Sequence, residues 1–148
     1  MTAGAELDMV FKQLCDKLDP SKSHSNINEY FDIVISVFPG ILTRERYVRG
    51  YGIVLKPFDG WTRGANPGWW SDGYNKIKHE RNAHFEKANL KVALDIIAAL
   101  SIILFAYYKV EYGQSLTFGI TDMPKLIVPY DRAKPDKEGY NYTLDMDA

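Results

Sequence analysis

Cysteine and histidine are scarce in this chain, and neither sign of charge dominates. One cysteine and three histidines occur in 148 residues, so an internal disulfide and a multi-cysteine zinc site are both excluded. The 18 basic and 19 acidic residues give a formal net charge of -1, which provides no global attraction to nucleic acid or to a membrane surface. Any surface that binds an anion must therefore be a local cluster of Lys and Arg.

Targeting and membrane signals are also missing. The first eight residues lack the basic and apolar segments of a secretory signal peptide. The most apolar run, residues 96–108, is shorter than the roughly 20 residues that a membrane span needs. Together with a single cysteine at position 15, expected as a buried thiol, these features predict a cytoplasmic protein that does not enter a membrane.

The composition is that of a folded domain. Hydrophobic residues make up 46% of the chain and aromatic residues 14%, more than disordered chains carry. The length suits one domain with its own core. We expect a single domain over residues 1–148, with residues 131–148 as a flexible tail.

Apolar residues recur at helical spacing in four segments. The first covers residues 5–18 and stops at Pro20, and the second, residues 27–37, follows a capping box of Asn26 and Glu29. A third helix opens at Asn66-Pro67 or at Ser71 and runs to about His84. The fourth follows an Asn89 cap and runs from Leu90 to about Lys109. Because this helix is apolar nearly all round, we expect it at the centre of a bundle or in a dimer interface.

Glycine and proline punctuate the segment between Gly40 and Gly68, where residues 51–55 are β-prone. Phe58 and Trp61 are the expected anchors of this long connection. Two further β-prone pieces, residues 115–120 and 125–130, follow the fourth helix. The predicted fold class is mainly α: a four- to five-helix bundle with a long connection carrying a short β element and a partly extended C-terminal tail.

The densest polar cluster lies just before the fourth helix, in residues 74–84. Residues four and seven apart share a helix face, so this segment predicts two adjacent rows. The members of the rows are Asn75, His79 and Asn82, and Tyr74, Lys78 and Arg81. An imidazole can move protons near neutral pH, cations can hold a phosphate, and amides can fix orientation. These are the groups that metal-independent RNA cleavage requires.

A plainer interpretation stands beside this one, because a helix rich in Lys, His, Glu, Arg and Asn is most often a solvated face. His84 is expected to cap or pack, and His24, in a loop, is given no role. Trp69 and Trp70 are expected to anchor the core rather than stack on bases. Arg44, Arg46 and Arg49, beside Tyr47 and Tyr51, either contact RNA phosphates or take the more ordinary solvated or strand-edge role.

The same region resembles the HEPN-like helical proteins of bacteria. The resemblance covers about forty residues. The matching positions are Trp69-Trp70, Tyr74-Asn75, Lys78-His79, Arg81, Phe85, Ala88-Asn89-Leu90 and the apolar helix that follows, with support from Pro57-Phe58 and Trp61. It implies a bundle of four or five helices that commonly dimerises. Many members are RNases of toxin, antiphage or stress systems, and others are non-catalytic partners.

The family signature is an Arg, then a polar residue that is often Asn, then a His separated from the Arg by a gap of four to six residues. In the segment Tyr74-Asn75-Lys76-Ile77-Lys78-His79 the Asn and His match, but Tyr74 stands where the catalytic Arg is expected. The resemblance thus implies a degenerate site. In it His79 is the acid or base, Asn75 orients it, and Arg81 completes the catalytic set. Lys78, Tyr74, Lys76 and Asn82 are the expected RNA contacts.

Three functions follow as hypotheses. The first is a HEPN-like homodimer acting on RNA, as a metal-independent endoribonuclease of a toxin–antitoxin or antiphage system, with no metal and no cofactor. The second is a non-catalytic helical module that dimerises or binds a regulatory protein partner, motivated by Tyr74 and by the balanced charge. The third is a small-molecule or nucleotide pocket lined by Trp61, Trp69 and Tyr74.

Overall fold

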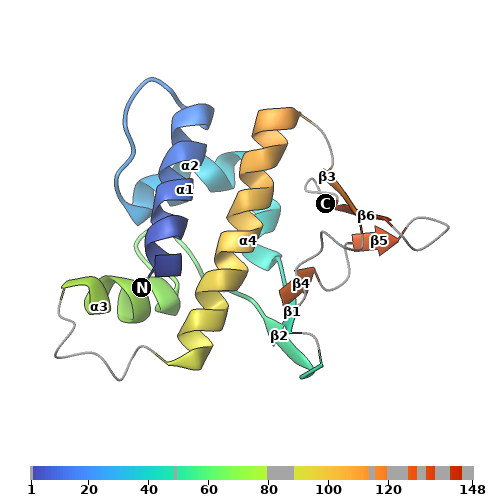
Figure 1. The fold of residues 1–148 in the computed structure, drawn as a ribbon. Coiled ribbons are helices and arrows are strands. Elements are labelled where there is room, and N and C mark those ends of the chain that lie inside the picture. The colour runs from blue at the N-terminus through green and yellow to red at the C-terminus, as the bar shows by residue number, and fades with distance from the viewer. Residues whose placement is uncertain are drawn as a thin grey trace.

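The computed structural model describes residues 2–48, 50–79 and 89–113, followed by the strands at 116–119, 127–129, 133–135 and 141–144 (Figure 1). The chain is mainly helical, as predicted. The helical elements are α1 (Thr2–Leu18), α2 (Ile27–Val37), the 3-10 helix η1 (Pro39–Thr43), the π-helix η2 (Trp69–Asn75), α3 (Lys76–His79) and α4 (Leu90–Tyr112). The strands are β1 (Arg46–Val48), β2 (Ile53–Leu55), β3 (Leu116–Gly119), β4 (Ile127–Pro129), β5 (Ala133–Pro135) and β6 (Asn141–Leu144).

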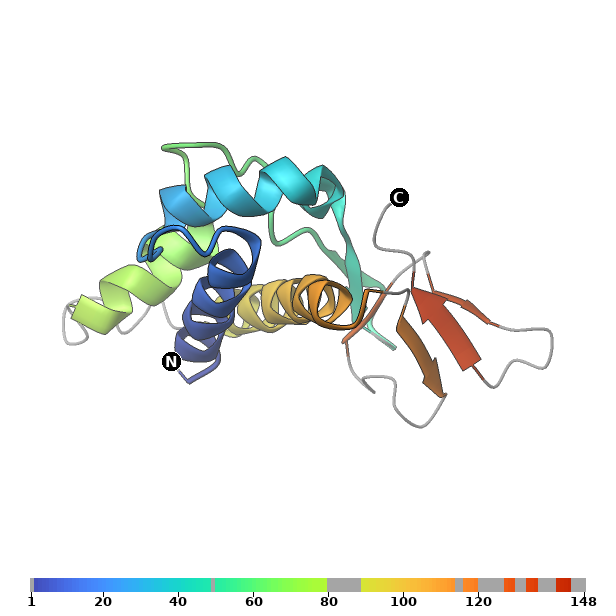
Figure 2. The ribbon, with the colours of Figure 1, turned by 90° about the horizontal axis from the view of Figure 1, so that it is seen from above.

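Helix α4 is the element around which the others are arranged. It packs along α1, and it also contacts η2 and β2 (Figure 1). In the view from above, α2 lies along the upper edge of the picture, with α1 and α4 below it, and η2 and α3 lie at the left (Figure 2). Ile96, Ala99, Ile102, Ile103 and Ala106 of this helix are buried in the main core, which agrees with the first of the two positions expected for it and leaves the dimer interface as a prediction.

The predicted helix caps are present. The Asn26 side chain accepts hydrogen bonds from the backbone N–H groups of Asn28 and Glu29, both at 3.1 Å, and Glu29 accepts one from Ser25 N at 2.8 Å. Asn89 Oδ1 accepts from Val92 N at 3.1 Å at the start of α4. These bonds satisfy N–H groups that the first turn of a helix leaves unpaired.

The long connection is held in place by an aromatic cluster, as the sequence predicts. Phe58 and Trp61 are fully buried, with ring centroids 5.2 Å apart. Phe11 of α1 stacks on Tyr30 of α2 at 5.1 Å and meets the ring of Trp61 edge-on at 5.9 Å. Aromatic pairs at these distances add to the free energy of burial. A connection with little regular structure is therefore part of the core.

One short strand was expected in this connection, and the structure contains a hairpin. Strands β1 and β2 pair antiparallel, and β4 pairs with the other edge of β1, so the sheet order is β2-β1-β4. Gly50 and Gly52 have φ values of +83° and +65° in the turn, a conformation that other residues rarely adopt. The hairpin partner β1 was missed because its sequence, Arg-Tyr-Val, follows charged residues and lacks an apolar alternation.

The C-terminal part also contains more strand than expected. Ile127 is buried with Val48, Leu55 and Ala98, so this segment packs back on the fold. Residues 131–148, expected as a flexible tail, contain β5 and β6, and the second sheet has the order β3-β6-β5. The Asn-Tyr-Thr-Leu sequence of β6 includes two residue types favoured in strands. The acidic end of the sequence concealed that signal.

Candidate functional site

The predicted site segment is helical, but its first part is a π-helix. Residues Trp69–Asn75 have π-helical geometry, and α3 continues from Lys76 to His79. The carbonyl of Pro67 accepts hydrogen bonds from Trp70 N at 2.9 Å and Ser71 N at 3.1 Å, and the π-helix begins at Trp69, between the two predicted starts at Asn66-Pro67 and Ser71. Single π turns are frequent at functional sites, so this geometry is compatible with a site in the segment.

Gly73 lets the π-helix approach α4 closely. A Cβ atom at this position would lie 2.5 Å from Cγ1 of Val92, closer than real Cβ contacts. Gly4 plays the same part on α1, where a Cβ would clash with the ring of Tyr74. The segment is therefore clamped between α1 and α4 at two glycines, a feature that the sequence analysis did not identify.

One face of the segment is anchored in the core. Trp69, Trp70, Tyr74 and Ile77 are 4% to 8% exposed. Trp69 Nε1 donates to the carbonyl of Pro57 at 2.5 Å, and the rings of Trp70 and Tyr74 lie 5.3 Å apart. The tryptophans are core anchors, as predicted. Tyr74, expected to contact RNA, is 6% exposed, so little of its ring is left for stacking on a base.

The opposite face carries the predicted polar residues. Asn75, Lys76, Lys78 and His79 are all exposed on consecutive turns. Lys76 Nζ lies 2.6 Å from Asp72 Oδ1, and Lys78 Nζ lies 5.4 Å from the ring centroid of Tyr74. The imidazole of His79 has no hydrogen-bond partner among residues 2–79 or 89–113. Asn75 and His79 thus share a solvent-facing turn, without a contact that fixes the imidazole.

Three members of the predicted cluster cannot be placed. Arg81, Asn82 and His84 lie outside the described residues. The structure therefore brings Asn75, Lys76, Lys78 and His79 onto one surface, which we call the polar turn, and directs Tyr74 inward. The Arg81 part of the site remains a prediction.

The arginines of the connection have a different environment from the one expected. Arg44 is 3% exposed and Arg46 2%, so neither is solvated and neither offers its charge to an RNA phosphate. Arg46 Nε donates to Ser101 Oγ at 2.8 Å, and its guanidinium lies 5.4 Å from the ring centroid of Phe105. Burial and the charge of Arg44 lower the pKa of Arg46 to about 9. Arg49 lies outside the described residues.

Cys15 and His24 have structural surroundings. Cys15 is fully buried, as predicted, and burial together with the charge of Asp16 raises its pKa to about 12. His24, given no role from sequence, is 3% exposed, with Nδ1 3.5 Å from Asp16 and Nε2 3.6 Å from Asp19. It joins the loop after α1 to the end of that helix. Within the described part of the chain, no three His, Cys, Asp or Glu residues are grouped as metal ligands.

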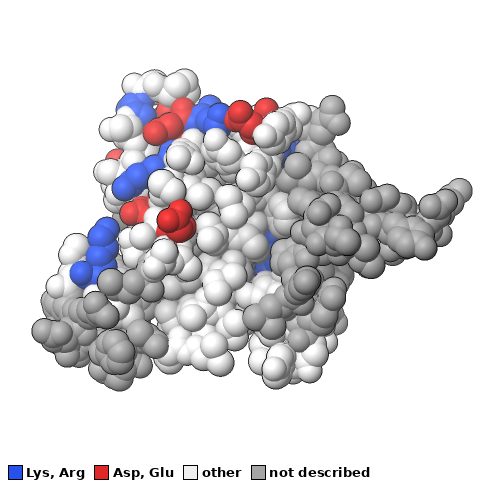
Figure 3. Space-filling model, in the orientation of Figure 1, with Lys and Arg blue, Asp and Glu red and all other residues white. Residues whose placement is uncertain are grey.

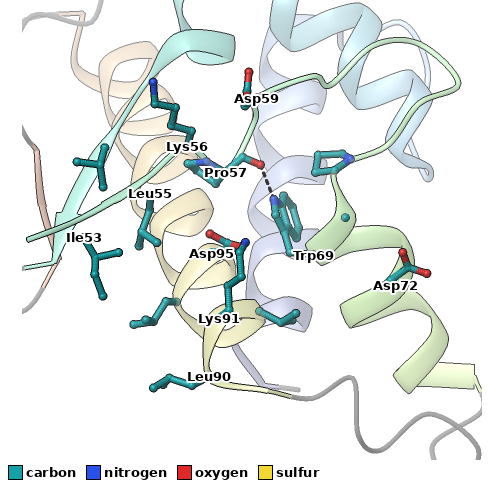
Figure 4. A pocket seen from close by; sticks show the side chains of 15 residues that line it. Ile53, Leu55, Lys56, Pro57, Asp59, Trp69, Asp72, Leu90, Lys91 and Asp95 are labelled. Atoms are coloured by element: carbon teal, nitrogen blue, oxygen red, sulfur yellow. Dashed lines mark hydrogen bonds and ion pairs between the residues drawn. The ribbon is translucent and has the colours of Figure 1, made fainter. Parts of the chain in front are cut away.

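A groove lies between β2, the start of η2 and the first turns of α4 (Figure 4). Its volume is about 860 Å³. Ile53, Leu55 and Lys56 stand along one side, Leu90 and Lys91 along the other, and Trp69 at the end nearest η2 (Figure 4). Of the residues expected in a small-molecule pocket, Trp69 lines this groove, whereas Trp61 is buried in the aromatic cluster and Tyr74 lies on the other side of η2.

Helix α4 also has an apolar surface that the fold leaves partly uncovered. This helix is the one in the described part of the chain with the length and composition of a membrane span, and 44% of its most apolar window is buried in the fold. Residues at spacings of three and four along it stay exposed or half-buried. They are Ala93, Ile97, Leu100, Leu104 and Tyr108, which we call the α4 stripe. Charged side chains gather along the top and upper left of the face that carries α1 and α4, and most of the area below them that is not grey is uncharged (Figure 3).

Comparison with known proteins adds no relative to these observations. No protein-family model, no curated protein and no solved structure matches the chain.

Proposed function

We propose that this chain is a HEPN-like helical protein that acts on RNA through the polar turn. The observation that carries the proposal is the division of one short helical segment into two faces. Trp69, Trp70 and Tyr74 fix its buried face, while Asn75, Lys78 and His79 project into solvent from the other. Groups that must reach a phosphate need such a rigid support and an open approach.

Each member of the polar turn has a role suited to its chemistry. Lys78 has no ion-pair partner among the described residues, so its ammonium is available to a phosphate. Lys76 is already paired with Asp72 and contributes less. His79 acts as acid or base on the 2'-hydroxyl, Asn75 orients it, and Arg81 stabilises the charge that builds on the phosphate. Asn82 extends the RNA contact.

Dimerisation belongs to the same proposal, as a property of the α4 stripe. Five neighbouring positions without a charge form a surface that a two-fold axis can pair with its own copy. Exposure of such a surface on a lone molecule would favour aggregation. We propose that two chains associate through this stripe.

RNA binding and cleavage are tested separately. Binding of a fluorescent single-stranded RNA is measured by anisotropy over a range of salt concentrations for wild type, Lys78→Ala and Lys22→Ala. Lys22 is an exposed loop lysine and the matched control. Lys78→Ala should weaken binding and reduce the salt slope by about 0.7, the value for one phosphate contact on a single strand. Equal slopes in all three proteins would contradict the RNA contact.

Cleavage is followed on total RNA with EDTA present. Wild type should degrade it and His79→Ala should not, since the imidazole moves the proton. If both proteins bind RNA and neither cleaves it, the enzyme proposal is wrong and the binding proposal stands.

A non-catalytic association module is the second candidate, and the burial of Tyr74 favours it. The position of the family arginine is filled by a core residue that contacts Trp70 and α1. On this view the α4 stripe is the functional surface. Light scattering after size exclusion should give a dimer for wild type and a monomer for Ile97→Lys, whereas Asp32→Lys, at an exposed position on α2, should remain dimeric. A monomeric wild-type protein would refute the proposal of an association module.

A further inference from the structure

The groove beside β2 follows the edge of a strand. Four consecutive residues, Ile53, Val54, Leu55 and Lys56, line it. Successive side chains of a strand point to opposite faces, so a groove on one face would contact alternate residues. Contact with all three residues of β2, whose side chains alternate between the two faces, and with Lys56 just after the strand places the groove along the strand's edge.

That edge has no strand beside it among the described elements. In the order β2-β1-β4, β2 is hydrogen-bonded to β1 on one side, and its other side faces the groove. An edge strand presents backbone N–H and C=O groups that can pair with another chain. Within β2, Ile53 and Val54 are 43% and 40% exposed and no charge lies between residues 53 and 55, so apolar surface accompanies this edge.

Four of the five charged side chains that line the groove are paired with one another or with neighbours. Lys56 Nζ lies 2.7 Å from Glu45, Lys91 Nζ 2.6 Å from Asp95, and Asp72 pairs with Lys76. Trp69 Nε1 is bonded to the carbonyl of Pro57. A polar small molecule would have few partners here. The groups that remain are the Asp59 carboxylate, the backbone of β2 and apolar surface, including Leu90 at 74% exposure.

We propose that this groove binds an extended peptide segment of a partner protein, which adds to β2 as a fourth strand of the sheet. Main-chain hydrogen bonds to β2 give the affinity, and apolar side chains at alternate positions of the peptide reach the exposed side chain of Leu90. The lining carboxylates Asp59, Asp72 and Asp95 outnumber the lining amines Lys56 and Lys91, so a segment without acidic residues fits best. This inference is independent of the RNA proposal.

A random peptide library displayed on phage and selected on the full chain tests the proposal. Enriched peptides should carry apolar residues at alternate positions and few acidic ones. The most enriched peptide is then synthesised with a fluorophore and measured by anisotropy. Leu90→Lys should weaken its binding by at least about tenfold, whereas Tyr51→Lys should not, because Tyr51 has the same 74% exposure but lies outside the groove.

Removing backbone N–H groups from the peptide distinguishes strand addition from simple apolar contact. The same peptide with N-methyl groups at alternate amides keeps its side chains and loses hydrogen bonds on one edge, so one of the two methylation patterns should abolish binding. Amide hydrogen exchange in residues 53–55 should slow when the unmodified peptide binds. Failure to enrich any peptide, equal binding by both methylated forms, or equal binding by Leu90→Lys would overturn the proposal. Lys78→Ala should leave peptide binding unchanged, which keeps this result separate from that of the RNA experiment.

Discussion

Two cationic clusters of this chain resemble each other in sequence and differ in environment. Arg44 and Arg46 are within a few residues of Tyr47, and Lys76 and Lys78 are within a few residues of Tyr74. The arginines are at most 3% exposed, and Arg46 bonds to Ser101 of α4, whereas the lysines stand on an exposed turn. A planar guanidinium accommodates burial by stacking on Phe105 and bonding to Ser101, which the smaller ammonium cannot do equally well. Similar composition therefore marks a structural cluster in one place and an accessible surface in the other.

Replacing Tyr74 by Arg tests this contrast most severely, because it introduces the family's arginine at a core position. The new charge would be buried between Trp70 and α1. We expect the free energy of unfolding to fall by about 3–5 kcal/mol, measured by urea denaturation followed by circular dichroism. Tyr74→Phe, which keeps the ring, should cost less than about 1 kcal/mol. A stable Tyr74→Arg protein with new RNase activity would show that this position belongs to the site.

The buried cluster is tested next by Arg46→Ala. This change removes the bond to Ser101 and the contact with Phe105 and leaves a cavity, so unfolding should become about 2–4 kcal/mol easier in the same assay. Arg46→Met fills most of the space without a charge and should recover most of the loss. An effect of Arg46→Ala below about 0.5 kcal/mol would mean that the arginine is solvated after all.

The helices and their caps could be predicted from the sequence because their signals are local. Asn26 with Glu29, and Asn89 before an apolar run, each specify a helix start within a few residues. The burial of Trp69 and Trp70 could also be predicted, because large apolar rings at the start of an amphipathic helix usually pack into the core.

The hairpin and the buried arginines could not be predicted in this way. Strand β1 is three residues long, and its pairing with β4 joins positions about eighty apart. Arg46 is buried because Ser101 and Phe105 of α4 receive it, a contact across fifty-five positions. The burial of Tyr74 likewise depends on a glycine of α1. Single-sequence patterns carry no information about such distant partners.

The buried thiol of Cys15 predicts how the free energy of unfolding depends on pH. Its pKa rises from 9.0 to about 12 in the folded chain, so the unfolded state loses its proton first as pH rises. The stabilising contribution is complete below pH 9 and is lost between pH 9 and about 12, at up to about 1.4 kcal/mol per pH unit. We expect the stability difference between wild type and Cys15→Ala to shrink over that window. A difference that stays constant would contradict the raised pKa.

The smallest effect on stability is expected for the exposed polar turn, from Lys78→Ala and His79→Ala. Neither side chain donates or accepts a hydrogen bond among the described residues, so each change should alter the free energy of unfolding by less than about 0.5 kcal/mol. Removal of Lys78 also loses its contact with the Tyr74 ring, and Lys78→Arg should restore that contact while preserving the charge. If either alanine variant unfolded as readily as Arg46→Ala, the polar turn would be part of the framework, and a loss of RNA binding in that variant would reflect unfolding. With stability unchanged, the same loss identifies a surface that evolved to contact a ligand.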